Sequence, residues 1–490
     1  MKFLKINVRK KAVRWIARGL AATGSVTPLA GWGLQPLNIL FIVSEDNGPE
    51  IGCYGSPVST PHFDALAGKG TRFDKAYVPQ AGCSQSRASF LTGLYPHQNG
   101  QIGLATWKYA MYRPNTPNVV STLKKAGYRT GIIGKLHVNP SSAFPFDFKA
   151  VPESNFSRKN MTRYTQATRD FIGKNDTPFY LQVNHPDAHR PFIRQVDGLP
   201  KRPLSGSEVD ALPYMGLNHP ELRQQTADYY NCMMRLDHYV GQLLDILEAS
   251  GKSDQTLVVY IGDHGADIFR GKRTCYEGGV RIPMIIRWPG APAKQVRNDL
   301  VSTLDLFPTF CAAAGIAAPI GLPGRSLRPL LSGPVSDWRK TMVTEYHVHS
   351  NHNPWPQRAI RNHQFKLIHN PLAGQENPGY AFTFHKFLKT EEHIVLGEAS
   401  ERIQQAYARM KQPPEFELYD LETDPFEFNN LAGNPAFRSQ QETLLRQLRA
   451  WQKKTRDALA DPAQARKLFQ QITDAGMKRS LLPYKAFMAP

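Results

Sequence analysis

Cys83 opens a segment that can place a sulfur atom at the N-terminus of a short helix. The residues after Cys83 read as one helix that ends at Gly93. Negative charge is favoured at a helix N-terminus, because the first backbone N–H groups have no partner within the helix. Arg87 lies one turn further along, where it can neutralise an anionic nucleophile and bind an anionic substrate. The segment indicates chemistry on an anion, whereas a buried structural thiol is the alternative for any single cysteine.

Two pairs of potential metal ligands each follow a stretch that reads as a buried strand. Glu45 and Asp46 come directly after the first strongly apolar run, and Asp263 and His264 come after a later one. The carboxyl ends of parallel strands meet at one edge of a sheet, so the two pairs can converge. Together these residues offer ligands for a divalent cation. Helix caps and strand-end turns are the alternative for single acidic residues at such positions.

Four further basic side chains are candidates for the same place. Lys135 and His137 follow a third apolar run, and His189 and Lys272 lie further along the chain. A leaving alkoxide needs a proton or a nearby positive charge, and a lysine or histidine held over the bridging oxygen supplies either. Considered one at a time, a lysine is usually solvated and a histidine usually has no functional role.

The apolar runs alternate with helical patterns. One helix is predicted to begin with Thr116 as its cap and Pro117 in its first turn and to end at Gly127, and a longer one covers 221–249. This alternation predicts an α/β fold with a mostly parallel central sheet flanked by helices. The predicted strands are 37–44, 129–134, 179–183, 257–262 and 283–288.

The regular alternation of predicted strands and helices ends near residue 350. We expect a catalytic domain over 37–350 and a smaller α+β C-terminal domain over 351–490, with an antiparallel sheet and a terminal helix that begins near Pro435. A strand is predicted over 361–370. The tail beyond Ala460 is polar and is expected to be peripheral.

Residues 1–36 are basic at the start and then rich in Ala, Gly and Leu, as an export signal would be, although Arg14 and Arg18 interrupt the apolar part. The expected location is therefore periplasmic or secreted, with the cytoplasm as the alternative, in which case 1–36 is a disordered basic N-terminus. No run approaches the roughly eighteen apolar residues of a membrane span.

The formal net charge of +19 is unevenly placed, since seven positive charges precede Glu45, the first acidic residue. Such an excess attracts polyanions, for example a sulfated oligo- or polysaccharide. Nucleic acid would be attracted as well, but no nucleic-acid-binding module is recognisable. The five cysteines are odd in number and widely spaced, so neither a disulfide framework nor a thiolate zinc site is indicated. Nothing in the sequence indicates the oligomeric state.

The segment CSQSRASFLTG resembles the sulfatase signature C-x-P-S-R-x-x-x-L-T-G, with Gln85 in place of the usual proline. This resemblance implies an alkaline-phosphatase-like fold. It also implies that a formylglycine-generating maturation enzyme oxidises Cys83, after which the hydrated aldehyde attacks sulfur and later expels sulfate. The matching residues are Cys83, Ser86, Arg87, Leu91, Thr92 and Gly93.

The resemblance also implies one divalent metal, held where sulfatases usually read Asp-Asp and Asp-Asn-Gly. Calcium is the ion expected first, whereas Mn or Zn is the alternative because His264 is a softer ligand than oxygen. Asp-His-Gly is also similar to the phosphonate and phosphodiester hydrolases of the same superfamily, which favour transition metals. The implied metal ligands are Glu45, Asp46, Cys83, Asp263 and His264.

The other basic residues fall in further segments that look like sulfatase segments. Lys135 and His137 take the places of a lysine and a histidine that contact sulfate and the nucleophile. His189 resembles the histidine of a P-H-x-P-like segment, and Lys272 precedes YEGGVRIPMIIRWPG, which matches a family segment closely. We favour His189 and Lys272 for the leaving group.

Within the sulfatases, CSQSRASFLTGLYPHQNG, GYRTGIIGKLHVNP and QFKLIHN look most like heparan N-sulfatases, or sulfamidases. The segment from Glu345 keeps His349 as a substrate contact but has Ser350 where that group has an acidic residue. The resemblance implies hydrolysis of a sulfate ester or an N-sulfate on an acidic, heparan-sulfate-like or other glycan. A phosphonate or phosphodiester hydrolase and a catalytically silent glycan-binding protein, in which Gln85 prevents maturation, are the alternatives.

Overall fold

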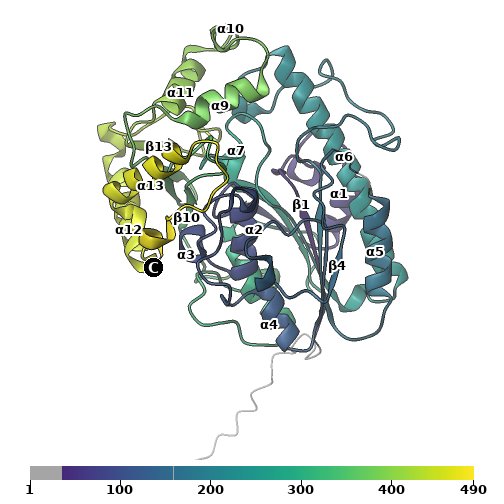
Figure 1. Cartoon of the computed structure of the whole chain (residues 1–490). Helices are drawn as coiled ribbons and strands as arrows, with labels where there is room; N and C mark the ends of the chain where they lie inside the picture. The colour runs from purple at the N-terminus through teal and green to yellow at the C-terminus, as the bar shows by residue number, and fades with distance from the viewer. Residues whose placement is uncertain (1–35, 158, 160, 490) are drawn as a thin grey trace, which may run out of the picture. The chain divides into compact units, whose positions relative to one another are not determined.

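The computed structural model describes residues 36–157, 159 and 161–489, and its central feature is a nine-stranded sheet (Figure 1). The strand order is β4-β3-β5-β1-β6-β7-β2-β8, with β9 paired to β2. The strands are β1 Asn38–Ser44, β2 Thr71–Tyr77, β3 Arg129–Ile133, β4 Phe148–Ala150, β5 Phe179–His185, β6 Thr256–Gly262, β7 Arg281–Arg287, β8 Gln295–Arg297 and β9 Val301–Ser302.

Five neighbouring strands of this sheet, β4-β3-β5-β1-β6, run parallel to one another. β7 is antiparallel to both of its neighbours, β6 and β2. The predicted mostly parallel sheet is confirmed. All five predicted strands exist, each within two residues of the expected bounds at either end.

Helices cover both faces of the sheet because alternate strand residues point to opposite sides. On β1, Leu40 and Ile42 belong to the core cluster shared with α6, whereas the ring of Phe41 packs against Phe90 and Phe310 on the other side. In Figure 1 the helices of the first face lie to the right of the sheet and α2 and α4 to its left. The first set is α1 Pro61–Gly68, α5 Thr162–Ile172 and α6 Pro220–Ala249, and the second is α2 Cys83–Thr92, α4 Val119–Lys125 and α8 Leu306–Ala313.

The predicted start of α4 was wrong by a few residues. Asn118, not Thr116, is the N-cap, and its side-chain oxygen accepts a hydrogen bond from Ser121 N at 3.0 Å. Asn is among the best N-cap residues. Asn118 therefore caps the helix in place of Thr116, because it directly precedes Val119, the first apolar residue of the helix. Gly127, with a φ of 88°, follows the helix as expected.

A second, four-stranded antiparallel sheet has the order β10-β11-β12-β13. The first strand of this sheet lies before residue 351, in the part of the chain assigned to the catalytic domain. The domain boundary at 350 remains a prediction. The strand predicted over 361–370 exists but begins later than expected, at Phe365, because Arg361 ends the preceding strand and the chain turns between them. The side chain of Asn362 accepts hydrogen bonds from Gln364 N and Phe365 N in that turn. The strands are β10 Met342–Tyr346, β11 Gln357–Arg361, β12 Phe365–His369 and β13 Phe416–Asp420.

The tail beyond Ala460 is not peripheral as predicted. α13 carries a buried apolar stripe that includes Leu468 and Ile472, and the Tyr484 hydroxyl donates to Gly100 O at 2.8 Å. The tail is polar in composition, but its few apolar residues recur at helical spacing and so form one face. The remaining helices are α3 Pro96–Asn99, α7 Glu277–Val280, α9 Pro378–Phe387, α10 Glu392–Gly397, α11 Glu401–Lys411, α12 Arg438–Thr455, α13 Pro462–Ala475 and α14 Lys485–Met488.

Among the described residues, no helix has both the length and the apolar character needed to cross a membrane. Each of the five cysteines is a free thiol, and all but Cys53 are buried. The segment 1–36, for which an export signal was expected, lies outside the described residues apart from Pro36.

Candidate active site

The two pairs of potential metal ligands meet where β1 and β6 end side by side. The backbone N–H of Asp263 donates to Ser44 O at 2.9 Å, and the backbone N–H of Asp46 donates to Asp263 Oδ1 at 2.9 Å. Glu45, Asp46, Asp263 and His264 are all at most 1 % exposed. Parallel pairing of the two strands therefore brings together ligands that are more than 200 residues apart.

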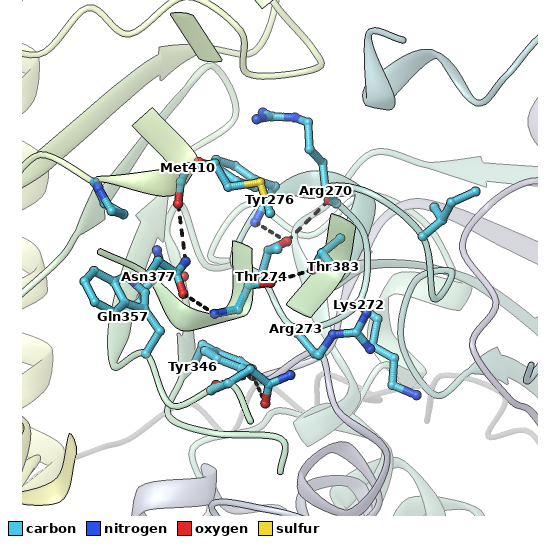
Figure 2. Close-up of a pocket in the computed structure, with 15 residues that line it drawn as sticks. Arg270, Lys272, Arg273, Thr274, Tyr276, Tyr346, Gln357, Asn377, Thr383 and Met410 are labelled. Atoms are coloured by element: carbon cyan, nitrogen blue, oxygen red, sulfur yellow. Dashed lines mark hydrogen bonds between the residues drawn. The ribbon is translucent and has the colours of Figure 1, made fainter. Parts of the chain in front are cut away.

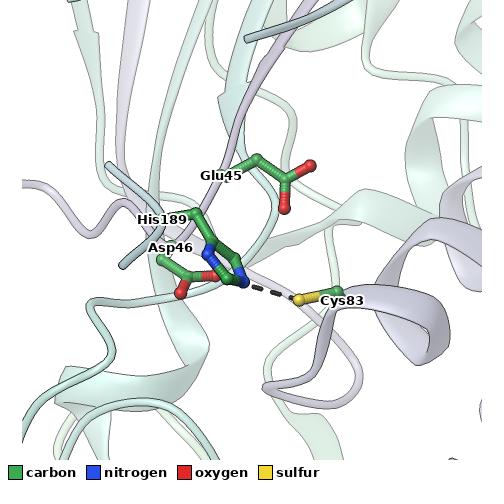
Figure 3. A group of neighbouring side chains, drawn as sticks. All are labelled: Glu45, Asp46, Cys83 and His189. Atoms are coloured by element: carbon green, nitrogen blue, oxygen red, sulfur yellow. Dashed lines mark hydrogen bonds between the residues drawn. The ribbon is translucent and has the colours of Figure 1, made fainter. Parts of the chain in front are cut away.

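Cys83 faces this cluster from the N-terminus of α2. Gly82, with extended backbone, precedes the helix, and Gly93 ends it with a φ of 68°, in the left-handed region that glycine tolerates. The Cys83 Sγ atom lies 3.2 Å from Lys272 Nζ and 3.4 Å from His264 Nε2, and the thiol donates to Asp46 Oδ1 at 3.8 Å. Figure 3 shows the thiol pointing toward Asp46, with Glu45 and His189 around it.

The surroundings of Cys83 favour its ionised form. Burial by itself would raise the pKa of the thiol, but the positive charges of Lys272, Lys135 and His264 outweigh burial and hold the pKa well below its ordinary value. The position therefore stabilises negative charge on the atom that residue 83 presents to the cavity.

Arg87 is fully buried and joins α2 to the strand ends. Its Nη2 donates to Glu45 Oε1 at 2.6 Å and to Asp263 Oδ2 at 3.1 Å, and its Nη1 donates to Asn184 Oδ1 at 2.8 Å. The guanidinium thus neutralises the carboxylates that lie beside Cys83. The hydrogen bonds of Arg87 in the structure go to these protein groups, whereas the sequence analysis expected the side chain to bind an anionic substrate.

Lys135 and His137 follow β3 at the same edge of the sheet. The Lys135 ammonium donates to Glu45 Oε2 at 2.7 Å. Burial, followed by the charge of Lys135, lowers the pKa of His137 to about 4, so its ring is neutral at pH 7. His137 has a φ of 59°, in the left-handed region, so an unfavourable backbone conformation is retained beside the site.

Lys272 is held by a compact loop over 270–276. Thr274 Oγ1 donates to Gly271 O at 2.8 Å and accepts from Tyr276 N at 3.2 Å, in the wall of a small cavity of about 30 Å³ (Figure 2). Lys272 Nζ donates to the two Asp46 carboxylate oxygens at 2.9 and 3.0 Å. Burial would lower the pKa of Lys272, but Asp46 and Cys83 raise it above its ordinary value, so the ammonium stays charged.

His189 lies close to Glu45, Asp46 and Cys83 (Figure 3). Its ring stacks on Phe156 with the centroids 3.5 Å apart and an interplanar angle of 4°. Its Nδ1 lies 2.6 Å from Arg190 O, which requires a proton on Nδ1 and leaves Nε2 free to accept one. Lys159 Nζ donates to His189 O at 2.6 Å and fixes the backbone.

A cavity of about 590 Å³ opens above Cys83. Its walls are partly apolar, from Leu104, Phe146 and Phe156, and partly cationic or imidazole. The sequence-predicted residues that line it are Cys83, Lys135, His137, His189 and His349. A substrate in this cavity would therefore contact residue 83 together with cationic and imidazole groups.

Two overlapping groups of residues could each hold a metal ion. Within each group, the ligand atoms all lie within 4.8 Å of one another. Burial, together with the charges of Glu45 and Cys83, raises the pKa of Asp263 to about 6 against the opposing effects of His264 and Arg87. A carboxylate in that state gains from an added cation, and the donors are types that divalent ions accept, so the residues fit a divalent metal. The groups are Glu45, Asp46, Cys83 and His189, and Asp46, Cys83, Asp263 and His264.

The chain belongs to the sulfatase family, a family of hydrolases that typically use formylglycine and a metal. A family model described as sulfatase matches residues 37–316, which is more than half of the chain. A second model, described as N-sulphoglucosamine sulphohydrolase, C-terminal, matches residues 262–377. The predicted family and enzyme class are confirmed.

Two relatives align over most of the chain. The N-sulphoglucosamine sulphohydrolase of Homo sapiens is 33% identical, over 86% of this chain and 91% of its own length. An ulvan-active sulfatase of Formosa agariphila is 29% identical, over 86% and 81%.

Solved structures confirm the alkaline-phosphatase-like fold. A structure described as a 2-O GAG sulfatase has a TM-score of 0.67 at 21% identity and covers 87% of this chain and 94% of its own. The phosphonate monoester hydrolase of Silicibacter pomeroyi has a TM-score of 0.61 at 21% identity, with 86% and 96% covered. At such identities these likenesses show the fold alone.

Several residues at the site were missed from the sequence. Asn184, a partner of Arg87, is the last residue but one of β5, so its place near the carboxyl end of a strand was a usable signal. Phe156 and Lys159 lie in an irregular segment and carry no pattern that indicates their contacts with His189. Gln85 was noted only as a departure from the signature.

Proposed function

We propose that this chain hydrolyses a sulfate ester or an N-sulfate on a sulfated glycan, with residue 83 as the nucleophile after conversion to formylglycine. The observation that carries the proposal is the position of Cys83 beside the ammonium of Lys272 and at the floor of a 590 Å³ cavity lined by Lys135, His137 and His189. Cations beside a nucleophile suit an anionic sulfate group and the charge that develops on the leaving oxygen.

Each of these residues has a proposed task. Lys135 and His137 bind sulfate oxygens from the end of β3, while Arg87 keeps the carboxylates behind residue 83 in place. Lys272 faces the leaving oxygen with a fixed positive charge. His189, whose Nδ1 proton is held by Arg190 O, exchanges a proton at Nε2.

The two groups that the family implies would be held by residues already described. Formylglycine at position 83, when formed, supplies a hydrated aldehyde as an oxygen nucleophile. A divalent metal held by Glu45, Asp46, Asp263 and His264 together with residue 83 would supply positive charge next to that oxygen. We propose calcium as this metal, with Mn or Zn as the alternative suggested by His264.

The sugar and the sulfate position are the finer part of the proposal. Similarity to N-sulphoglucosamine sulphohydrolase favours an N-sulfated glucosamine unit. Ser350, at the expected acidic position, offers no charge to a positively charged amino sugar and favours an O-sulfate instead. Turnover of N-sulfoglucosamine should be compared with that of 2-O- and 6-O-sulfated glucosamine, and the ratio of kcat/KM values assigns the class.

A phosphonate or phosphodiester hydrolase is the second candidate, because His264 Nε2 lies 3.4 Å from Cys83 Sγ where a softer metal ligand would act. Rates with a phenyl phosphonate monoester and an aryl sulfate, measured on one preparation, separate the two. A phosphonate rate that exceeds the sulfate rate would overturn the sulfatase proposal.

The state of residue 83 separates an enzyme from a silent glycan-binding protein. We expect co-expression with a formylglycine-generating enzyme to give a peptide about 18 Da lighter than the cysteine form. Cys83→Ala should abolish turnover while the protein stays folded. An unmodified thiol under those conditions, or an undiminished rate in Cys83→Ala, would contradict the nucleophile assignment.

A further inference from the structure

We propose that Gln85 is a positioning residue that places His349 beside residue 83. Gln85 stands where the sulfatase signature has proline. The proposal rests on the proposed function for its kinetic readout, and it concerns the backbone that carries one wall of the cavity.

The Gln85 side chain reaches across from α2 to two other segments. It is fully buried, and its Nε2 donates to Val348 O at 2.6 Å and to Ile102 O at 3.3 Å. Val348 directly precedes His349, so the amide fixes the peptide that carries the histidine. Removal of this amide takes from Val348 O the shorter of its two side-chain donors, so the Val348 peptide is held less firmly.

A second glutamine, in the segment that precedes α2, makes the same bridge. Gln80 Nε2 donates to Ile102 O at 3.3 Å and to Val348 O at 3.2 Å, and its Oε1 lies 2.9 Å from the Nδ1 of His347. Gln85 provides the shorter contact to Val348 O. The two amides therefore hold one register between the segment at 102 and the segment at 348.

That register is continued by the backbone of His349 itself. Leu104 N donates to His349 O at 2.9 Å, and Leu104, His349 and Cys83 all line the same cavity. A shift of the Val348 peptide would consequently move the imidazole relative to residue 83.

The helix does not itself require glutamine at this place. Residue 85 is the third residue of α2, and the first intrahelical donor is Ser86 N, which bonds Gly82 O at 2.9 Å. The backbone N–H of residue 85 has no acceptor within the helix, so proline fits there without loss of a hydrogen bond. Gln85→Pro thus removes the amide and leaves the helix intact.

A double-mutant cycle tests the proposal with Gln85→Pro, His349→Ala and the double variant. Formylglycine content is measured by peptide mass, and kcat is expressed per matured site. KM and kcat are measured for every variant on the sulfated substrate that the wild type hydrolyses with the highest kcat/KM. We expect Gln85→Pro to lower kcat/KM about tenfold through KM in the wild-type background, and by less than about twofold when His349 is already alanine. Ser89→Ala, a change on the same helix at a buried hydroxyl that has no hydrogen-bond partner among the described residues, should change neither value.

An equal loss in both backgrounds, or no loss from Gln85→Pro, would overturn the positioning role. Gln85→Met, which keeps a side chain of similar length but has no donor, gives the same test if the proline variant does not fold. If matured wild-type protein hydrolyses no sulfate, the proposed function fails by itself. The same four proteins are then compared by the dissociation constant of inorganic sulfate, and the same pattern of non-additivity decides the role of Gln85.

Discussion

Arg87 Nη2 lies 2.6 Å from Glu45 Oε1, and both side chains are out of contact with solvent. The pair joins the helix that carries Cys83 to the end of the central strand. A buried ion pair of this kind adds little net stability compared with an apolar pair, but removal of one partner leaves the other charge without compensation.

Replacement of Arg87 by methionine should therefore destabilise the protein. We expect the free energy of unfolding in urea to fall by about 3–5 kcal/mol, because the carboxylates of Glu45 and Asp263 lose their buried cation. The double variant Arg87→Met with Glu45→Gln should recover part of that loss. A single variant as stable as the wild type would contradict the assigned contacts.

Lys272→Met should lower kcat while the fold is kept. The ammonium lies 3.2 Å from Cys83 Sγ and stays charged, so its loss removes the positive charge nearest to the reacting group. We expect kcat to fall by about 10²–10³-fold, as for other electrostatic groups, when it is expressed per formylglycine. Lys69→Met, at an exposed lysine, is the matched control. Equal kcat values for the two variants would rule out the role.

Stability should fall in acid because of Glu345. Burial would raise the pKa of this carboxyl, but His97 and Arg358 outweigh burial and lower the pKa to about 2 from the ordinary value of 4.5. Since the folded-state pKa lies below the unfolded value, the contribution of about 3 kcal/mol is present above pH 4.5 and is lost as the pH falls toward 2.

The measurement is the urea midpoint of wild type and Glu345→Gln between pH 7 and pH 2.5. The variant should be the less stable of the two at pH 7, and the difference should shrink as the pH approaches 2.5. A difference that is the same at every pH would show that the ionisation of Glu345 does not contribute.

Metal removal should lower both activity and stability. A metal that binds only the folded state adds about 2.7 kcal/mol at a concentration one hundred times its Kd, so chelator-treated protein should show a lower Tm that returns with the right ion. Titration with calcium, manganese and zinc, followed by Tm and by rate, identifies that ion.

His264→Asn then tests which residue sets the choice of metal. An amide oxygen in place of imidazole should shift the preference toward calcium by about tenfold or more relative to manganese. An unchanged order of preference would place His264 outside the metal site.

Prediction from the sequence succeeded where the signal was local or repeated. The strand that ends before Glu45 and the one that ends before Asp263 were recognisable from apolar runs alone, and α2 from Cys83 to the glycine that ends it. It failed for the turn at Asn362 that separates β11 from β12 and for the buried face of α13, because a turn within an apolar run and a sparse apolar stripe in a polar segment give weak local signals.

The sequence by itself determined the family, the alternation of strands and helices, and the residue types from which the site is built, since these depend on local order along the chain. Only the tertiary structure decided which partners those residues take. It placed Arg87 on two carboxylates, Lys272 on Asp46, and Gln85 on the peptide before His349. Such contacts join atoms that are distant in sequence, and they are set by strand register and by burial, for which no short stretch of residues carries the information.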